Sequence, residues 1–294
     1  MICVLFALLT AASNATAAVL QRKAAAQIPE SRAMHVSLIR ELIRRRIWLA
    51  GIGMVVAAAL FQAAALATGP IALVQPIFII ELPLTLLLAV ILNHDLAKLR
   101  RLPWRAIMVT TVALGAGLTV ANPSGAIDRA QNSSWAIALI VTAAFEALLI
   151  SMALSTRGEP RAVLLGLAAA CAYALTAALM KNAMADLNVS GLRFLTSWHV
   201  YATAIAGAGA LFLLQNALQA GSLVASQPML TVGDALISIG YGVTLYSEQL
   251  RTGWWLIPQI AALVLIFYGC VQVAKSPLAA EATPVAAETA ATVR

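Results

Sequence analysis

Nine long runs of apolar residues, separated by short polar segments, set the pattern of this chain. Each run comes close to the roughly 20 apolar residues that an α-helix needs to cross a bilayer. We therefore expect an all-α, polytopic membrane bundle of about nine transmembrane helices. The predicted spans lie near residues 1–20, 48–67, 71–92, 105–121, 135–154, 162–181, 195–216, 223–245 and 254–273.

Two of the junctions between spans consist of turn residues. Gly69 and Pro70 separate the second span from the third, and Gly221 separates the seventh from the eighth. Glycine and proline are the strongest signals of a turn. We therefore expect tight turns at these two places and not long loops.

The same two turns begin a pair of similar segments, GPIALVQP (Gly69 to Pro76) and GSLVASQP (Gly221 to Pro228). Each segment opens a long apolar run with a carboxylate in its middle. Five predicted helices form the first half, so the two halves enter the membrane in opposite directions. We predict an inverted repeat of five plus four helices, the arrangement typical of secondary transporters. Weaker matches at a similar offset pair residues 16–24 with 176–183 and residues 93–96 with 247–250.

The repeat divides the chain into three predicted regions. Residues 1–155 form the first transmembrane repeat, residues 156–275 form the second, and residues 276–294 form a disordered cytoplasmic tail. Within the first repeat, residues 31–46 have apolar and basic positions at helical spacing and should form an amphipathic interfacial helix. This helix could contact an anionic lipid or phosphate, but a topology anchor on the inner leaflet is the simpler interpretation.

Composition and charge support a membrane location. Of all residues, 62% are hydrophobic and only 11% are charged, which is too little polar surface for a water-soluble domain. Short cytoplasmic loops collect Lys and Arg. With the amino terminus outside and the carboxyl terminus cytoplasmic, only Arg129, Lys181, Arg193 and Arg251 of the 19 basic residues fall outside. The net charge of +7 therefore reflects topology and implies no nucleic acid partner.

The alanine-rich composition, without a recognisable eukaryotic targeting signal, favours a bacterial plasma (inner) membrane. The first span could also be a secretory signal peptide, given the small residues from Ala11 to Ala18. No basic residue precedes it, however, and this favours a retained helix. Cys3, Cys171 and Cys270 lie within predicted spans at unrelated spacings, which indicates neither a disulfide framework nor a metal cluster.

Three carboxylates, Glu81, Glu146 and Asp234, fall in the middle of predicted spans. A charge at the bilayer centre costs at least about 2.5 kcal/mol even on lenient insertion scales. Such residues are therefore expected to bind a proton, a cation or a polar substrate. Glu81 and Asp234 hold similar positions in the two repeats and are the stronger candidates, also as ligands of a metal ion. Glu146 has no counterpart, because the second half lacks a fifth span.

Helix-breaking residues flank both candidate carboxylates. Pro76 and Pro83 bracket Glu81, while Pro228 and Gly233 precede Asp234. We expect both helices to be broken there, because backbone carbonyls freed by a break can join a coordination shell.

Amide side chains lie near these positions in sequence. Gln75 and Gln227 stand beside the predicted breaks and are expected to orient substrate, and Gln62 adds a further donor and acceptor. The alternative is that they only form hydrogen bonds between helices, as most intramembrane amides do. The sequence leaves the two interpretations equally open.

Several polar and aromatic residues fall at predicted membrane edges. His199 is expected to be an interfacial histidine, and Lys181 and Arg193 either attract an anionic substrate or extend to the interface from helix ends. The tryptophans other than Trp198 are expected to form an aromatic belt at the span edges: Trp48, Trp104, Trp135, Trp254 and Trp255.

The run from Trp48 to Leu96 resembles the second and third helices of the drug/metabolite transporter (DMT) superfamily. The matching elements are the Ala-rich stretch Ala63 to Ala67, the Gly69-Pro70 step, the segment Val74-Gln75-Pro76 and the acidic segment His94-Asp95-Leu96. Asn216 to Ser238 resembles the second repeat of the same superfamily. The nearest branches are the EamA-like proteins and the NIPA-like magnesium transporters.

The resemblance implies a secondary transporter that moves a small metabolite or a cation by alternating access through a central cavity. The alternative within the superfamily is a NIPA-like magnesium transporter, and nine spans suit that branch. The expected partners are the lipid bilayer and the small-molecule or cation substrate, without a cofactor. Whether the chain acts alone or as a homodimer stays open.

Two other classes of protein fit the sequence less well. Thr231 to Asp234 resembles the end of the Gly-x-Gly-Asp segment of intramembrane aspartyl proteases, but the first glycine is missing. We therefore expect no enzymatic activity. A non-transporting membrane scaffold is the further alternative. Only the predicted intramembrane carboxylates argue against it, because such residues are costly and usually functional.

Overall fold

The computed structural model describes residues 2–92, except 26–45, and residues 102–276, except 222. The predicted amphipathic helix, the segment His94-Asp95-Leu96 and nearly all of the predicted tail lie outside the described residues. All regular elements of the described part are helices, and one isolated β-bridge pairs Ser124 with Gln249.

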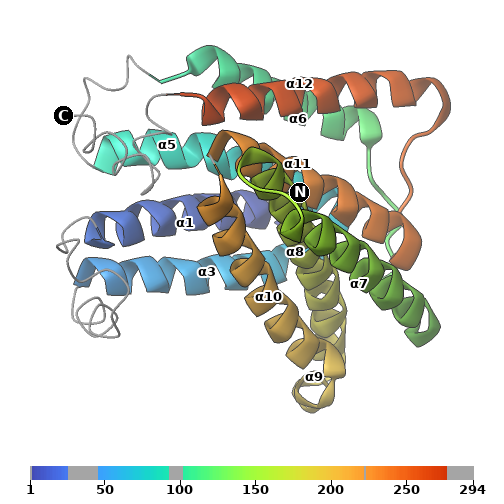
Figure 1. The fold of residues 1–294 in the computed structure, drawn as a ribbon. Coiled ribbons are helices and arrows are strands. Elements are labelled where there is room, and N and C mark those ends of the chain that lie inside the picture. The colour runs from blue at the N-terminus through green and yellow to red at the C-terminus, as the bar shows by residue number, and fades with distance from the viewer. Residues whose placement is uncertain (1, 26–45, 93–101, 222, 277–294) are drawn as a thin grey trace, which may run out of the picture.

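The helices follow one another along the chain (Figure 1). They are α1 (Ile2–Ala25), α3 (Arg46–Thr68), α4 (Ile71–Ile77), the 3₁₀ turn η2 (Phe78–Ile80), α5 (Glu81–Leu92), α6 (Trp104–Ala121), α7 (Asn132–Leu154), α8 (Glu159–Val189), α9 (Gly191–Thr196), α10 (Trp198–Ala220), α11 (Leu223–Leu245), the 3₁₀ turn η4 (Gly253–Trp255) and α12 (Leu256–Ala274).

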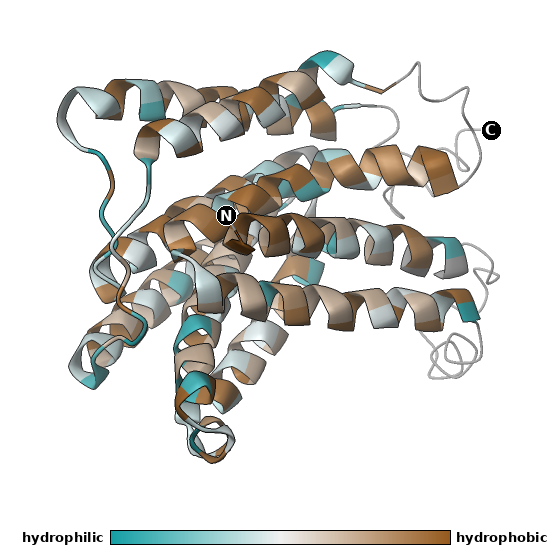
Figure 2. Ribbon diagram, turned by 180° about the vertical axis from the view of Figure 1, so that it is seen from behind, coloured by the Kyte–Doolittle hydropathy of each residue, from teal (hydrophilic) through white to brown (hydrophobic). Residues whose placement is uncertain are grey.

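Within the described residues, nine helical segments are long and apolar enough to cross a membrane, which confirms the predicted fold class. The elements α4, η2 and α5 together make one of these spans, Ile71–Leu92. Apolar residues dominate along the helices (Figure 2). Many large apolar side chains point outward, such as Leu60, Ile140 and Ile205 at 66%, 69% and 74% exposure. This surface suits lipid, and the chain is a multi-pass membrane protein.

The connections gather at two opposite ends of the bundle. At one end Glu248 meets Ile71, and Ala130 bonds to Asn182; we call it the Glu248 end. At the other end Lys23 donates to the carbonyl of Leu92, and we call it the Lys23 end. Successive spans join these two ends in alternation, as nine membrane passes require.

The helix packing agrees with the predicted repeat, both within each half and between the halves. α1 packs along α3 as α8 packs along α10, α4 packs against α11, and α6 lies beside α12 (Figure 1). The longest helix, α8, lies against α7, α10 and α11 and buries many alanines. At Gly166 of α8, an added Cβ would lie 2.9 Å from the carbonyl oxygen of Ser226 in α11. These two helices therefore touch through their backbones, as small residues permit in membrane bundles.

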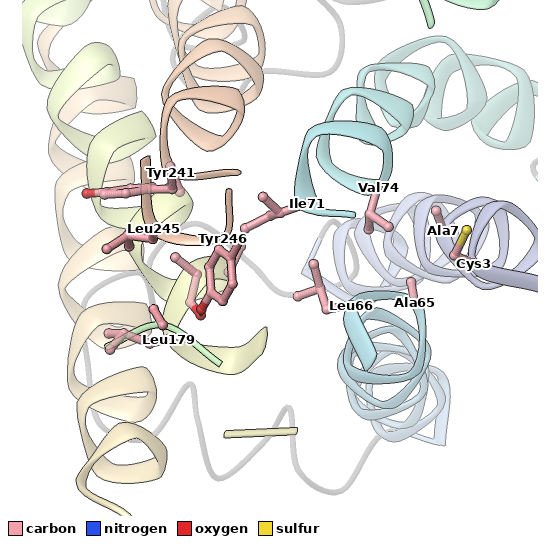
Figure 3. Packing of buried hydrophobic residues seen from close by; sticks show 14 of the residues in the cluster. Cys3, Ala7, Ala65, Leu66, Ile71, Val74, Leu179, Tyr241, Leu245 and Tyr246 are labelled. Carbon is pink, nitrogen blue, oxygen red and sulfur yellow. The ribbon is translucent and has the colours of Figure 1, made fainter. Parts of the chain in front are cut away.

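The largest apolar core lies toward the Glu248 end and joins both halves of the chain. Ile71 and Val74 of α4 and Leu66 of α3 pack in one cluster with Leu179 of α8 and Tyr246 after α11 (Figure 3). Tyr246 is fully buried, and its hydroxyl donates to the carbonyl of Ala178 at 2.6 Å. This core holds α4 and α8 in fixed positions around the polar groups described below.

Three predictions about single positions are wrong. The sixth span continues to Val189, so that Lys181 lies inside the protein at 4% exposure and does not extend to the interface. Trp135 is buried as well, and it packs edge-on against Trp198 and His199. The third error concerns α11, which is described next.

α11 runs as one helix from Leu223 to Leu245 with Pro228 inside it, so the predicted break before Asp234 is absent. Gly233 serves packing, because a Cβ there would lie 2.9 Å from Leu167 and 3.0 Å from Ala170, both on α8. In the first repeat the predicted break is present, since η2 interrupts the span between α4 and α5.

Candidate functional site

Glu81 begins α5 directly after the 3₁₀ turn, near the middle of its span. Pro76 and Pro83 explain the irregular backbone here, because neither can donate the hydrogen bond that would continue an α-helix. The Glu81 side chain is half-buried. The break therefore places a carboxylate at a point where the regular helix hydrogen bonding is interrupted.

Asn14 of α1 is the hydrogen-bond partner of Glu81. Its Nδ2 donates to Oε2 of Glu81 at 3.1 Å. A neutral amide satisfies one carboxylate oxygen without neutralising the charge. The other oxygen of Glu81 is left for a proton, a cation or a donor on a substrate. Asn14 is not among the residues predicted from the sequence, since one Asn in an apolar helix gives no specific signal.

Asp234 of α11 comes from the other half of the chain and is also half-buried. Ser238, one turn later, donates to its Oδ1 at 3.3 Å. The charge of Glu81 acts on Asp234, and both carboxylates act on the hydroxyl group of Tyr173 in α8. The structure therefore brings the two predicted carboxylates into one electrostatic environment beside α8.

Glu146 of α7 belongs to the same region of the bundle. Its charge and that of Asp234 both act on Cys171 of α8, and Glu146 also acts on Tyr241 of α11. Its Oε1 atom is buried without a hydrogen-bond partner. An unpaired buried charge is costly, so this carboxylate needs a proton or a cation.

The predicted amides form no hydrogen bond with these carboxylates in the described part of the chain. Gln75 is buried on α4 at 2% exposure, and its Nε2 has no hydrogen-bond partner. Gln62 and Gln227 are half-buried, and the described residues show no hydrogen bond from either to Glu81 or Asp234. The substrate-orienting role of Gln75 and Gln227 stays a prediction.

A protein-only metal cage is absent from the described part of the chain, which contains no group of three or more His, Cys, Asp or Glu side chains suited to hold a metal. Two carboxylates and bound waters are nevertheless a usual environment for Mg²⁺. The binding of a cation or a proton by Glu81 and Asp234 stays a prediction.

A second polar cluster lies at the Glu248 end. The carboxylate of Glu248 accepts hydrogen bonds from the backbone N–H groups of Ile71 and Ala72, at 2.6 and 2.8 Å. These N–H groups begin α4 and have no partner within the helix. Burial raises the pKa of Glu248, while the two N–H donors and the nearby Lys181 act in the opposite direction.

Lys181 completes this cluster from α8. Its Nζ lies 3.7 Å from Oε1 of Glu248 and donates to the carbonyl of Gly69 at 2.6 Å. Gly242 is required here, because a Cβ would collide with the Glu248 carboxylate and with Ile71. The cluster ties the turn between α3 and α4 to the second half of the chain. The repeat match at residues 247–250 pointed to Glu248 but not to its partners.

Asp186 centres a neighbouring cluster at the same end. It is paired with Arg129, accepts a hydrogen bond from Ser197 Oγ at 2.5 Å and lies 3.6 Å from His199 Nδ1. Asn182 bonds to the ring of His199 and accepts from the N–H of Ala130. This cluster fastens the 122–131 loop to α8 and α10.

Comparison with known proteins supplies one distant relative. An uncharacterized protein of Corynebacterium glutamicum is 25% identical to this chain over 272 residues, which cover 90% of the chain and 92% of the relative. No protein-family description matches the sequence, and no solved structure matches it. The similarity extends along nearly the whole membrane bundle, which indicates a shared architecture without assigning an activity.

Proposed function

We propose that this protein is a secondary transporter that moves a small metabolite or a cation across the membrane by alternating access. One observation carries the proposal: Glu81 of the first half and Asp234 of the second half both lie within membrane-spanning helices of one bundle, and the charge of Glu81 acts on Asp234. Intramembrane carboxylates are costly and usually mark an ion or substrate pathway.

The position of the two carboxylates suits alternating access. They come from different halves, and transporters of this kind hold substrate at the interface between repeats near the bilayer midplane. The broken backbone before Glu81 adds polar groups to the same place. At the Glu248 end the contacts of Glu248 and Lys181 hold the two halves together. A transport cycle that opens that end would have to break these contacts.

The DMT superfamily, with its EamA-like and NIPA-like branches, is the proposed family. The nine spans and the predicted inverted repeat support it, as does the similar packing of α1 with α3 and of α8 with α10. The proposed location is a bacterial inner membrane with the amino terminus outside. Magnesium is the second candidate substrate, because two neighbouring carboxylates suit a hydrated divalent cation.

Transport by purified protein in liposomes tests the proposal. Vesicles loaded with a pH-sensitive dye or a magnesium-sensitive dye would receive a defined pH gradient, with Mg²⁺ or pooled organic solutes outside. We expect solute-dependent proton movement or Mg²⁺ uptake by the native chain. Glu81→Gln and Asp234→Asn should each abolish it, since either change removes one of the two charges.

Asp128→Asn is the matched control, because it removes a carboxylate from the exposed loop before α7. It should transport like the native chain. Movement of Mg²⁺ without protons would select the magnesium alternative. Full transport by a folded Glu81→Gln, Asp234→Asn double variant would refute the proposed site, and no transport of any solute class would favour a scaffold.

A further inference from the structure

A pocket of about 480 Å³ lies between α7 and α11, over α8. Ile137 and Val141 of α7 form its rim and are 67% and 60% exposed. Cys171 of α8 and Tyr241 of α11 are buried and form its floor. α7 and α11 both pack along α8 but have little contact with each other. The pocket is therefore a gap between two helices, and its mouth lies on the surface that faces lipid.

The pocket follows these helices from one end of the bundle toward its middle. On α7 its lining begins at Ser134, two residues after the start of the helix, and ends at Phe145. At 1.5 Å per residue this stretch is about 16 Å long, close to half of the roughly 30 Å hydrocarbon core of a bilayer. On α11 the lining runs from Ile237 to Leu245, the last residue of that helix. Both helices thus place the pocket in the leaflet at the Glu248 end.

The hydroxyl groups deep in the pocket are already engaged. Thr142 donates its only proton to the carbonyl of Ala138 at 2.7 Å. The Tyr241 hydroxyl bonds to Thr142 Oγ1 and must therefore be the donor of that contact. At the rim, Thr244 donates to the carbonyl of Gly240. Small-molecule sites orient their ligand with a few placed polar groups. These three hydroxyls offer no free donor, and the lining contains no charged side chain.

An apolar pocket in a membrane protein can hold water, nothing or hydrocarbon. Water does not enter an apolar cavity that gives it no partners, and an empty gap forfeits the dispersion contacts of its lining. Hydrocarbon chains surround the mouth of this pocket in a membrane. A chain that enters loses no hydration, because it passes from lipid to apolar side chains, and it gains packing contacts with both helices.

We propose that this pocket binds one acyl chain of a phospholipid from the leaflet at the Glu248 end. The ester end of the chain lies near Ser134 and Thr244, where the helices reach the membrane edge, and the methyl end lies near Phe145 and Cys171. The chain packs against both α7 and α11 and so links two helices that otherwise meet only through α8. Its binding does not depend on whether the protein transports.

Photo-crosslinking of the full chain in lipid nanodiscs tests the site. Two phosphatidylcholine probes carry a diazirine on one acyl chain, either near the ester or near the methyl end, and each is added in trace amounts to unlabelled lipid. We expect α7 and α11 to be labelled more strongly than the lipid-facing surface of α10 around Ile205. The ester-end probe should label the region of Ser134 and Thr244, and the methyl-end probe the region of Phe145 and Cys171.

A pair of glycine variants tests the pocket without changing charge. Gly240 lines the pocket, and an added Cβ there meets nothing within 4 Å. Gly240→Leu should therefore fill the pocket and reduce the labelling of α7 and α11 to the level of α10. Gly209 of α10 is equally open and lies outside the pocket, so that Gly209→Leu should be labelled like the native chain.

Native mass spectrometry of the detergent-extracted chain gives an independent measurement. The native chain and Gly209→Leu should retain a single lipid, whereas Gly240→Leu should lose it. Retention of an apolar molecule other than a lipid would overturn the choice of occupant.

Three labelling results would overturn the site: equal labelling of α7, α10 and α11, native labelling in Gly240→Leu, or the opposite depth order of the two probes. The last result would mean that the chain enters from the other leaflet. If Gly240→Leu fails to fold, the depth order in the native chain decides the question. Labelling requires no transport, so the failure of the proposed function would leave this result unchanged.

Discussion

The ammonium group of Lys181 lies 3.7 Å from the carboxylate of Glu248, and both side chains are almost completely buried. Glu248→Ala removes the acceptor of two backbone N–H groups of α4 and leaves the Lys181 charge without its anion. Breaking a buried pair in this way costs about 3–5 kcal/mol. We expect a clearly lower midpoint of thermal unfolding in detergent.

Gln249→Ala serves as the control for Glu248→Ala, since this neighbouring side chain is exposed and a surface change of this kind has little effect. The double variant Lys181→Met, Glu248→Gln should recover part of the loss, because no unpaired charge remains. An unchanged midpoint in Glu248→Ala would contradict the buried contacts of Glu248 at this end.

Asp186 should matter more for stability than either arginine beside it. The Asp186 side chain is 7% exposed, whereas those of Arg129 and Arg193 are 35% and 54% exposed. Asp186→Ala should cost about 3–5 kcal/mol, because it leaves the other polar groups of a buried cluster unsatisfied. Arg193→Ala should cost less than about 1 kcal/mol, as expected for an exposed ion pair. Arg129→Ala should fall between them, and any other order in unfolding experiments would count against this cluster.

Gly166→Ala should destabilise the bundle even though it adds one methyl group. The new Cβ would lie 2.9 Å from the backbone of Ser226, and such overpacking costs about 1–3 kcal/mol. Gly115→Ala is the matched variant on α6, where a Cβ meets nothing within 4 Å. It should raise stability by about 0.5–1 kcal/mol through helix propensity. Equal unfolding midpoints for both variants would argue against the contact.

Labelling of single cysteines checks the orientation of the chain. The native cysteines Cys3, Cys171 and Cys270 are buried and would first be replaced by alanine. Asp128 and Arg157 lie in exposed connections at opposite ends of the bundle. In intact cells, a membrane-impermeant maleimide should label Asp128→Cys at once and Arg157→Cys only after permeabilisation. The reverse pattern would invert the proposed topology.

The spans could be predicted from sequence because each apolar run has the length that a bilayer demands. The tight turns at Gly69-Pro70 and at Gly221 are confirmed too, since α4 begins at Ile71 and α11 at Leu223. The end of the sixth span was misplaced at Lys181, because a charged residue in a hydropathy pattern indicates an edge. Here its charge is balanced by Glu248, 67 residues later, and only the tertiary structure shows this.

The candidate site was partly predictable. Glu81, Glu146 and Asp234 stood out as intramembrane carboxylates, but their arrangement in space depends on how α5 packs against α1 and on how α7 and α11 pack against α8. Pro228 shows the limit of single-residue rules. It lacks an N–H group, yet α11 continues through it, because neighbouring helices and local adjustments can satisfy the freed carbonyl group. The equivalent Pro76 is followed by Pro83, and that span is interrupted.

The contact at Gly166 also indicates which helix interfaces of this bundle separate more readily than others. Two helices that touch backbone to backbone, as α8 and α11 do there, have no side chain between them that could change rotamer and let one slide past the other. α4 meets the second half differently, through an ion pair and hydrogen bonds that water could replace one by one. When this protein changes conformation, α8 and α11 should move together as a single rigid body. The contacts between α4 and the second half of the chain should break first.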